Sequence, residues 1–279
     1  PDAPITIRLE GHNGIARISA SNAMNITGNG CLISKIVNSN LSAGLTIGNG
    51  ATVNVMYSTT TEGVTTNTVY GSYSYDTITV RNNNRLVLAP GAVLTVGERE
   101  ELAFIQNASL SDLTIGAGAS IINNGIVILP QGTTAAQIAA LPLSGSGIVR
   151  VVTAYNDGSP SAWDTYSNDG VALNPVGGLG EGLDLTEGDH SGKTVANDGY
   201  AWNDTNQTLT LGNAYIAGNV TLPAGAIVNT TATTVISEQL KGKSGAALNI
   251  TLGGTAPLSI GGGISGGTNG DTVTVQGGA

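Results

Sequence analysis

The sequence predicts an all-β protein, built as a right-handed parallel β-helix with a large acidic loop insertion and one or two short helices. The first observation is a recurring sequence motif. Two short segments in which apolar residues alternate, joined by a Gly-Ala corner, occur at residues 45–55, 86–96, 113–121 and 220–228. A unit this small cannot bury its apolar face alone, so the copies must stack on one another. The composition agrees, because 41 glycines and only 10% charged residues suit many tight corners between short strands.

Residues 1–155 are predicted to form the first stacked strands of this β-solenoid. Short alternating segments separated by glycine-rich turns fit either a β-sandwich or a coil of strands. We favour the coil, because the Gly-Ala corners join very short strands and each turn of a parallel β-helix bends the chain about three times.

Period-two alternation puts alternate residues of a strand on one face. The apolar set that we expect to point into the core is Leu45, Ile47, Val53, Val55, Leu86, Leu88, Leu94, Val96, Leu113, Ile115, Leu209 and Leu211.

Two segments of this first part favour short helices. Residues 98–101 are rich in glutamate and predict a short helical turn. Residues 133–142 predict a better helix, because a threonine can cap its start, good helix formers fill it and Pro142 follows its end.

Residues 156–206 differ from the sequence around them. They hold nine of the nineteen acidic residues, one basic residue (Lys193), both tryptophans and three Asn-Asp-Gly turns. We interpret this segment as an insertion on one side of a single solenoid or as a linker between two β units. Residues 207–279 return to the repeat pattern and are predicted to form further turns of the solenoid.

Two stretches carry a resemblance. One is residues 123–147; the other contains Trp202, the strand Leu209-Thr210-Leu211 and the corner Leu222-Pro223-Ala224-Gly225-Ala226, in that order. They resemble β-helix-repeat surface proteins of Gram-positive gut bacteria, which are adhesin-like and regarded as carbohydrate-binding. The resemblance implies an extracellular or cell-surface location and a polysaccharide or host glycan as partner. It carries no catalytic residue over to this chain.

The charge pattern argues against some partners. The net charge is −9, and the ten Lys and Arg residues are scattered singly, so we expect no nucleic-acid binding. The longest apolar runs are far shorter than the roughly 20 residues that span a bilayer, so we expect no membrane insertion within this segment. Because the chain begins at Pro1 without a methionine, we interpret it as a mature or trimmed segment, and the resemblance implies that it is part of a longer surface protein.

Parallel β-helices also include pectate-lyase-like and polygalacturonase-like enzymes, so a polysaccharide lyase or glycoside hydrolase is the enzymatic alternative. Such enzymes need clustered carboxylates. In the repeats, Asp76 and Asp112 stand alone, and no histidine adjoins them. His12 and His190 are too few for a zinc site, and we expect both to be exposed loop residues. We therefore assign no catalytic residue.

Aromatic residues are the candidate carbohydrate-binding groups, because a flat ring can stack on a sugar while its polar neighbours bond to the hydroxyls. The alternative is that the tryptophans cap the open end of the solenoid. The candidates are Tyr73, Tyr75, Trp163, Tyr166, Tyr200 and Trp202.

No cofactor is expected, and calcium is the most plausible ion. Asp157, Asp164 and Asp169 lie in loops rich in glycine and asparagine, which supply the oxygen ligands that Ca²⁺ prefers. Their spacing matches no established calcium motif, and solvated turn residues are the alternative. The sequence as a whole predicts a non-enzymatic, adhesin-like module, with a structural stalk as the competing non-enzymatic function.

Overall fold

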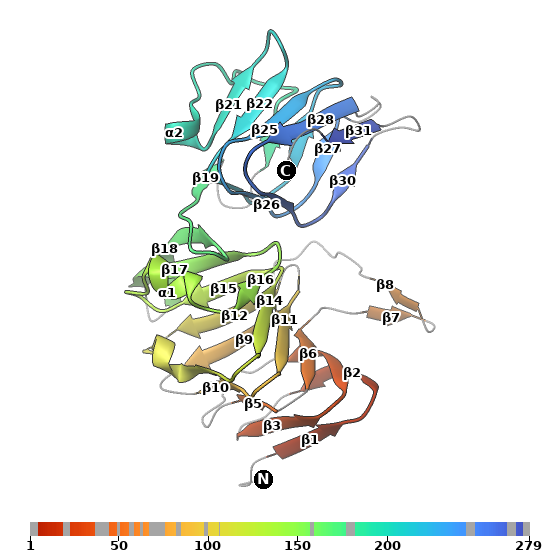
Figure 1. Ribbon diagram of the computed structural model, residues 1–279, viewed down its shortest axis with the longest axis vertical. Coiled ribbons are helices and arrows are strands. Elements are labelled where there is room, and N and C mark those ends of the chain that lie inside the picture. Colours follow the sequence, from red (N-terminus) through yellow and green to blue (C-terminus); the bar gives the residue numbers. More distant parts are fainter. Residues whose placement is uncertain are drawn as a thin grey trace. The chain divides into compact units, whose positions relative to one another are not determined.

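The chain divides into two compact units (Figure 1). Unit 1 comprises Pro1–Asp164 with Asn168–Gly170, and unit 2 comprises Thr165–Ser167 with Val171–Ala279. The computed structural model describes residues 5–18, 23–36, 45–48, 51–55, 59–61, 64–66, 76–81, 85–97, 100–105, 107–156, 159–176, 182–243, 249–266 and 272–275. Strands dominate these residues, which confirms the all-β prediction.

Unit 1 contains three sheets, whose neighbouring strands from β1 to β17 run parallel. Sheet I has the order β1 (Ile5–Leu9), β3 (Met24–Gly28), β5 (Leu45–Ile47), β10 (Leu86–Leu88) and β13 (Leu113–Ile115). Sheet II has the order β16 (Leu143–Ser144), β14 (Ser120–Asn123), β11 (Val93–Val96), β6 (Thr52–Val55), β4 (Cys31–Ile36) and β2 (His12–Ile18). Sheet III has the order β18 (Ser159–Ser167), β17 (Ile148–Asn156), β15 (Ile126–Leu129), β12 (Glu100–Ile105) and β9 (Asp76–Arg81).

From β5 to β15 the chain visits these sheets in rotation, apart from the β7–β8 hairpin, whereas β1 to β4 alternate between sheets I and II. β10, β11 and β12 lie in sheets I, II and III, and β13, β14 and β15 repeat the sequence. We call one such passage a circuit. Each strand therefore pairs with the strand one circuit away and not with the strand that follows it in the chain.

The three copies of the repeated sequence motif in unit 1 stack on one another in register. Leu86 pairs with Leu45 on one side and with Leu113 on the other. In the second copy, the corner between the two strands is a four-residue turn, closed by the Ala92 N–H donating to the Ala89 carbonyl at 3.0 Å. Gly91 has a φ of 72° at the third position of this turn, a conformation that glycine adopts without strain.

The predicted inward face is confirmed for nine residues, which are fully buried: Leu45, Ile47, Val53, Leu86, Leu88, Leu94, Val96, Leu209 and Leu211. Leu113 and Ile115 are only half-buried, because they belong to β13 at the edge of sheet I. The side chain of Val55 lies outside the described residues.

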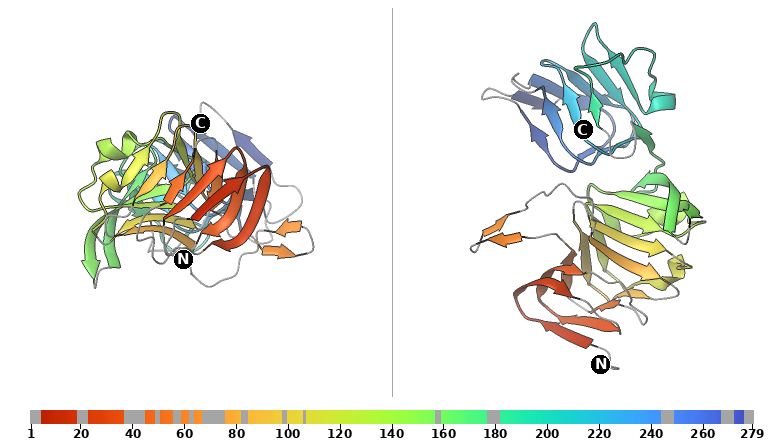
Figure 2. Two further views of the ribbon diagram at one scale, coloured as in Figure 1. Left: turned by 90° about the horizontal axis from the view of Figure 1, so that it is seen from below. Right: turned by 180° about the vertical axis from the view of Figure 1, so that it is seen from behind.

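Unit 2 repeats the arrangement with three sheets of its own, seen from two further directions in Figure 2. Sheet IV has the order β19 (Asn174–Val176), β23 (Ala214–Ile216), β26 (Thr234–Ile236) and β29 (Leu258–Ile260). Sheet V has the order β20 (Leu183–Asp184), β24 (Val220–Leu222), β27 (Leu240–Gly242) and β30 (Ile264–Ser265). Sheet VI has the order β21 (Tyr200–Asn203), β22 (Thr208–Leu211), β25 (Ile227–Thr230), β28 (Asn249–Gly254) and β31 (Thr272–Val275).

The strands of unit 2 pair in parallel, except that β21 and β22 are antiparallel. From β23 to β31 the chain visits sheets IV, V and VI in strict rotation. A cluster of buried residues, mostly leucine, isoleucine and valine, lies on the inner faces of these sheets.

Two short α-helices occur among the described residues, α1 (Ala135–Ala139) and α2 (Val195–Asp198), with one 3-10 turn, η1 (Leu110–Asp112). α1 confirms the helix predicted at residues 133–142, and Thr134 caps it by accepting from the Gln137 N–H at 3.3 Å. A further antiparallel hairpin, β7 (Thr59–Thr61) with β8 (Val64–Thr66), stands outside the parallel sheets.

The helical turn predicted at residues 98–101 is wrong for Glu100 and Glu101, which begin β12. Glu98 and Arg99 lie outside the described residues. β12 pairs with strands on both sides, and Leu102 and Phe104 are fully buried. Pairing and burial therefore outweigh the helix preference of glutamate.

Residues 156–206, interpreted above as an insertion or a linker, contain β18 to β21 and α2. β18 is the last strand of sheet III, whereas β19, β20 and β21 each stand first in one sheet of unit 2. The boundary between the two units falls within this segment, around residue 165.

Leu88→Ala is expected to lower the free energy of unfolding of unit 1 by about 2–5 kcal/mol, since truncating a fully buried leucine leaves a cavity. Ile115→Ala is expected to cost less, because Ile115 is half-buried. Urea unfolding followed by far-UV circular dichroism measures both losses. Equal losses at the two positions would contradict this difference in burial.

Candidate functional site

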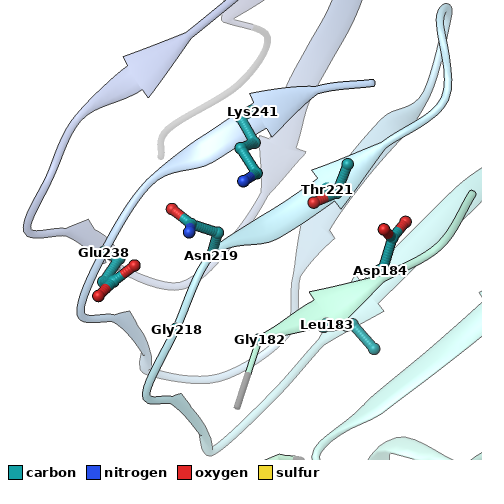
Figure 3. Close-up of a pocket in the computed structure, with 8 residues that line it drawn as sticks. All are labelled: Gly182, Leu183, Asp184, Gly218, Asn219, Thr221, Glu238 and Lys241. Carbon is teal, nitrogen blue, oxygen red and sulfur yellow. The ribbon is translucent and has the colours of Figure 1, made fainter. Parts of the chain in front are cut away.

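Sheet V directs one polar side chain of each strand away from the core of unit 2. Strand alternation buries residues such as Leu183 and turns their neighbours outward. The outward residues pair in register from strand to strand and form a line, which we call the polar row: Asp184, Thr221, Lys241 and Ser265. Figure 3 shows the first three on neighbouring strands, with Leu183 pointing to the other side.

Two shallow hollows lie along the polar row. The first has a volume of about 280 Å³ and the second of about 450 Å³. They share Asp184, Thr221 and Lys241, so together they form one continuous surface across sheet V. Glycine lines both hollows, for example Gly218 in the first and the exposed Gly266 in the second.

Hydrogen bonds hold several of the polar side chains at the hollows. Asp184 Oδ1 accepts from the N–H of Thr186 at 2.9 Å and from its hydroxyl at 2.7 Å. Asn219 Oδ1 accepts from the Gln239 N–H at 3.1 Å, and the Ser265 hydroxyl donates to Gln239 Oε1 at 3.1 Å. These bonds hold Asp184 and Asn219 at the first hollow and Ser265 at the second.

His190 ties the segment that carries Asp184 to the core of unit 2. Its Nε2 lies 2.8 Å from the Asp184 carbonyl and 2.9 Å from the Glu187 carbonyl. Both partners are acceptors, so Nε2 carries a proton and donates. Nδ1 lies 3.2 Å from the hydroxyl of Tyr200, a buried core residue whose phenol pKa is raised by burial.

His190 lies in a loop as expected, but the expectation that it is exposed is wrong, because it is half-buried and hydrogen-bonded on both ring nitrogens. His12 is exposed but begins β2. No local motif marks His190, because its partners come from a turn and from a strand after α2. Only the tertiary structure shows its role as an anchor.

Exposed turns flank this anchor in the chain. Hydrogen bonds from Ser191 lower the pKa of the Asp189 carboxyl. The Thr194 N–H and the Lys193 ammonium, 2.9 Å from Asp198 Oδ1, likewise lower the pKa of Asp198. These carboxylates are engaged by neighbours in the chain.

The aromatic candidates fall in different places. Tyr73 and Tyr75 lie outside the described residues. Trp163 is half-buried on β18 in unit 1, and the Arg150 guanidinium carbon lies 4.6 Å from the centre of its ring, a cation–π contact. Tyr166, assigned to unit 2, is half-buried and forms an isolated bridge with Ala172.

The other two aromatic candidates contact the core of unit 2. Tyr200 is part of the buried cluster, and Trp202 packs against it. The indole N–H of Trp202 donates to Asp204. These contacts are the ones expected of residues that anchor their segment, and their part in carbohydrate binding stays a prediction.

The calcium candidates are also dispersed. Asp157 lies outside the described residues, and Asp164 and Asp169 are exposed. Within the described part of the chain, no three His, Cys, Asp or Glu side chains are grouped in a way that could hold a metal ion. Calcium binding at these aspartates stays a prediction.

A search of protein-family models, of curated proteins and of solved structures finds no match to this chain. Among the described residues, no helix has the length and apolar character needed to cross a bilayer. The site is therefore interpreted from its own geometry.

His190→Ala is expected to lower the free energy of unfolding of unit 2 by about 1–3 kcal/mol, because two backbone carbonyls and the Tyr200 hydroxyl lose their partner. His12→Ala, at an exposed position, is the control, with an expected loss below about 0.5 kcal/mol. Urea unfolding of the two variants measures both losses. A His190 variant as stable as the His12 control would rule out the role of His190 as an anchor.

Proposed function

We propose that this protein is a non-enzymatic, adhesin-like module of a bacterial cell surface or secreted protein, and that it binds carbohydrate along the polar row of sheet V. The observation that supports this most directly is the register of sheet V. It lines up Asp184, Thr221, Lys241 and Ser265 beside two connected hollows.

The chemistry of the row suits a glycan. Sugar hydroxyls both donate and accept hydrogen bonds, and the row offers a carboxylate, an ammonium group and two hydroxyls. Neighbouring strands stand about 4.8 Å apart, so a chain-like ligand that crosses the sheet meets a polar side chain at each strand. The shallow, open form of the hollows suits an extended ligand better than a small enclosed one.

We also propose that each unit is a right-handed parallel β-helix. The rotation of the chain through three parallel sheets supports this. Connections between parallel strands of one sheet are right-handed in about 98% of cases, which supports the handedness. A scaffold of this kind would present the polar row on a rigid face.

The likeness of residues 123–147 and of the Trp202 segment to β-helix-repeat surface proteins of Gram-positive gut bacteria supports the location. By that likeness, the chain is one part of a longer extracellular protein, and its ligand is a polysaccharide or host glycan.

Replacing the two hydroxyl groups of the polar row tests the proposal. A Thr221→Val/Ser265→Ala double variant is expected to lower glycan retention about tenfold, because two hydrogen-bonding groups are lost. Thr210→Val is the matched control, since Thr210 is an outward threonine of sheet VI. A glycan array, run with and without calcium, measures retention. Unchanged binding by the double variant would reject the polar row.

The aromatic candidates provide a separate test. Trp202→Ala is expected to destabilise unit 2, because the indole packs against its core. Trp163→Ala removes the ring beside Arg150 in unit 1 and is expected to leave the array signal unchanged. If Trp163→Ala abolishes retention while circular dichroism shows an intact fold, the binding face lies in unit 1 instead of sheet V.

A further inference from the structure

Two lysines lie close together in the sequence, one on the outer face of β27 and one directly after its end. Lys241 is the outward residue of β27, Gly242 is buried, and Lys243 follows as an exposed residue. Residues two apart in an extended chain point to the same face, with Cα atoms about 6.6 Å apart. Both lysines line the second hollow.

Neither of these lysines has a carboxylate partner among the described residues. The third lysine of unit 2, Lys193, lies 2.9 Å from Asp198. No carboxylate oxygen of the described residues lies within 4.0 Å of the ammonium group of Lys241 or Lys243. Residues 171–279 contain eight acidic and three basic residues. Within the described part of this acidic unit, the two ammonium groups that form no ion pair thus both line the second hollow.

The neighbours of Lys241 in the polar row are uncharged. Thr221 and Ser265 flank it on the adjacent strands. Asp184 stands two strands away, a distance of about 10 Å at the usual strand spacing, and its Oδ1 is engaged by Thr186. The Asp184 and Glu187 carboxylates also line the second hollow, but neither lies within 4.0 Å of either ammonium group. An anionic group above β27 would therefore meet two ammonium groups and flanking hydroxyls.

We propose that the ligand of this face is an acidic polysaccharide, whose carboxylate or sulfate groups bind between Lys241 and Lys243 while its hydroxyls bond to Thr221 and Ser265. This inference rests on the carbohydrate-binding function proposed above and names the class of glycan. The net charge of −9 repels polyanions at long range, so their retention requires a local site. Charge-assisted hydrogen bonds to two ammonium groups provide one.

The experiment measures binding of the full chain to three immobilised polymers: polygalacturonate, which carries carboxylates, dextran sulfate, which carries sulfates, and neutral dextran. The wild-type chain is expected to bind one or both acidic polymers at least tenfold more tightly than dextran, and more weakly as salt rises, because exposed charges are screened. The stronger of the two acidic polymers identifies the anionic group.

Variants locate the site. Lys241→Gln/Lys243→Gln is expected to weaken acidic-polymer binding at least tenfold, whereas Lys193→Gln, which removes a positive charge from the same unit, changes it less than twofold. Lys241→Arg/Lys243→Arg keeps both charges and is expected to retain binding. All these side chains are at least partly exposed, and circular dichroism checks that each variant is folded.

The outcomes separate this inference from the function on which it rests. Equal binding of acidic and neutral polymers, or a lysine-to-glutamine variant that binds as wild type does, overturns the acidic ligand. If the acidic ligand is overturned in this way but the Thr221→Val/Ser265→Ala variant loses glycan retention, the proposal that sheet V binds carbohydrate is still supported. Failure of the wild-type chain to bind either acidic polymer also overturns the inference.

Discussion

The pairing of each strand with the strand one circuit away is the interaction on which the rest of this structure depends. β10 has three residues and bonds to β5 and β13, and no neighbour in the chain replaces either partner. Strands this short satisfy their backbone groups only through such long-range pairs. A slip of one residue would turn Leu86 and Leu88 toward solvent, so burial and pairing specify the same register.

The corners keep this register from circuit to circuit. Gly91 takes the left-handed conformation that the turn requires, and Ala92 is fully buried behind it. A buried side-chain amide also connects successive parts of the chain. Asn123 is fully buried and donates to the Ile148 carbonyl at 2.9 Å and to Asn168 Oδ1 at 2.8 Å. Because the polar atoms of a buried side chain must find partners, Asn123 links parts of the chain that are distant in sequence.

The same register that buries leucines also aligns the outward residues. In sheet V this places Asp184, Thr221, Lys241 and Ser265 in one line without any local motif. His190 then ties the beginning of that line to the core through Tyr200. The proposed binding face is thus a consequence of strand pairing on its outer side, and its charge pattern is the part that can select a ligand.

Most of the strands, nine of the twelve inward positions, the Gly-Ala corners and the capped helix α1 could be predicted from the sequence, because each of these depends on neighbours within a few residues. Residues at equivalent positions of the repeated motif also pair in the structure: Leu86 pairs with both Leu45 and Leu113. Three features follow only from the three-dimensional arrangement: Glu100 begins a strand, His190 is an anchor, and the polar row exists. These features join residues from different circuits, and the loops between the strands decide which residues of successive circuits become neighbours.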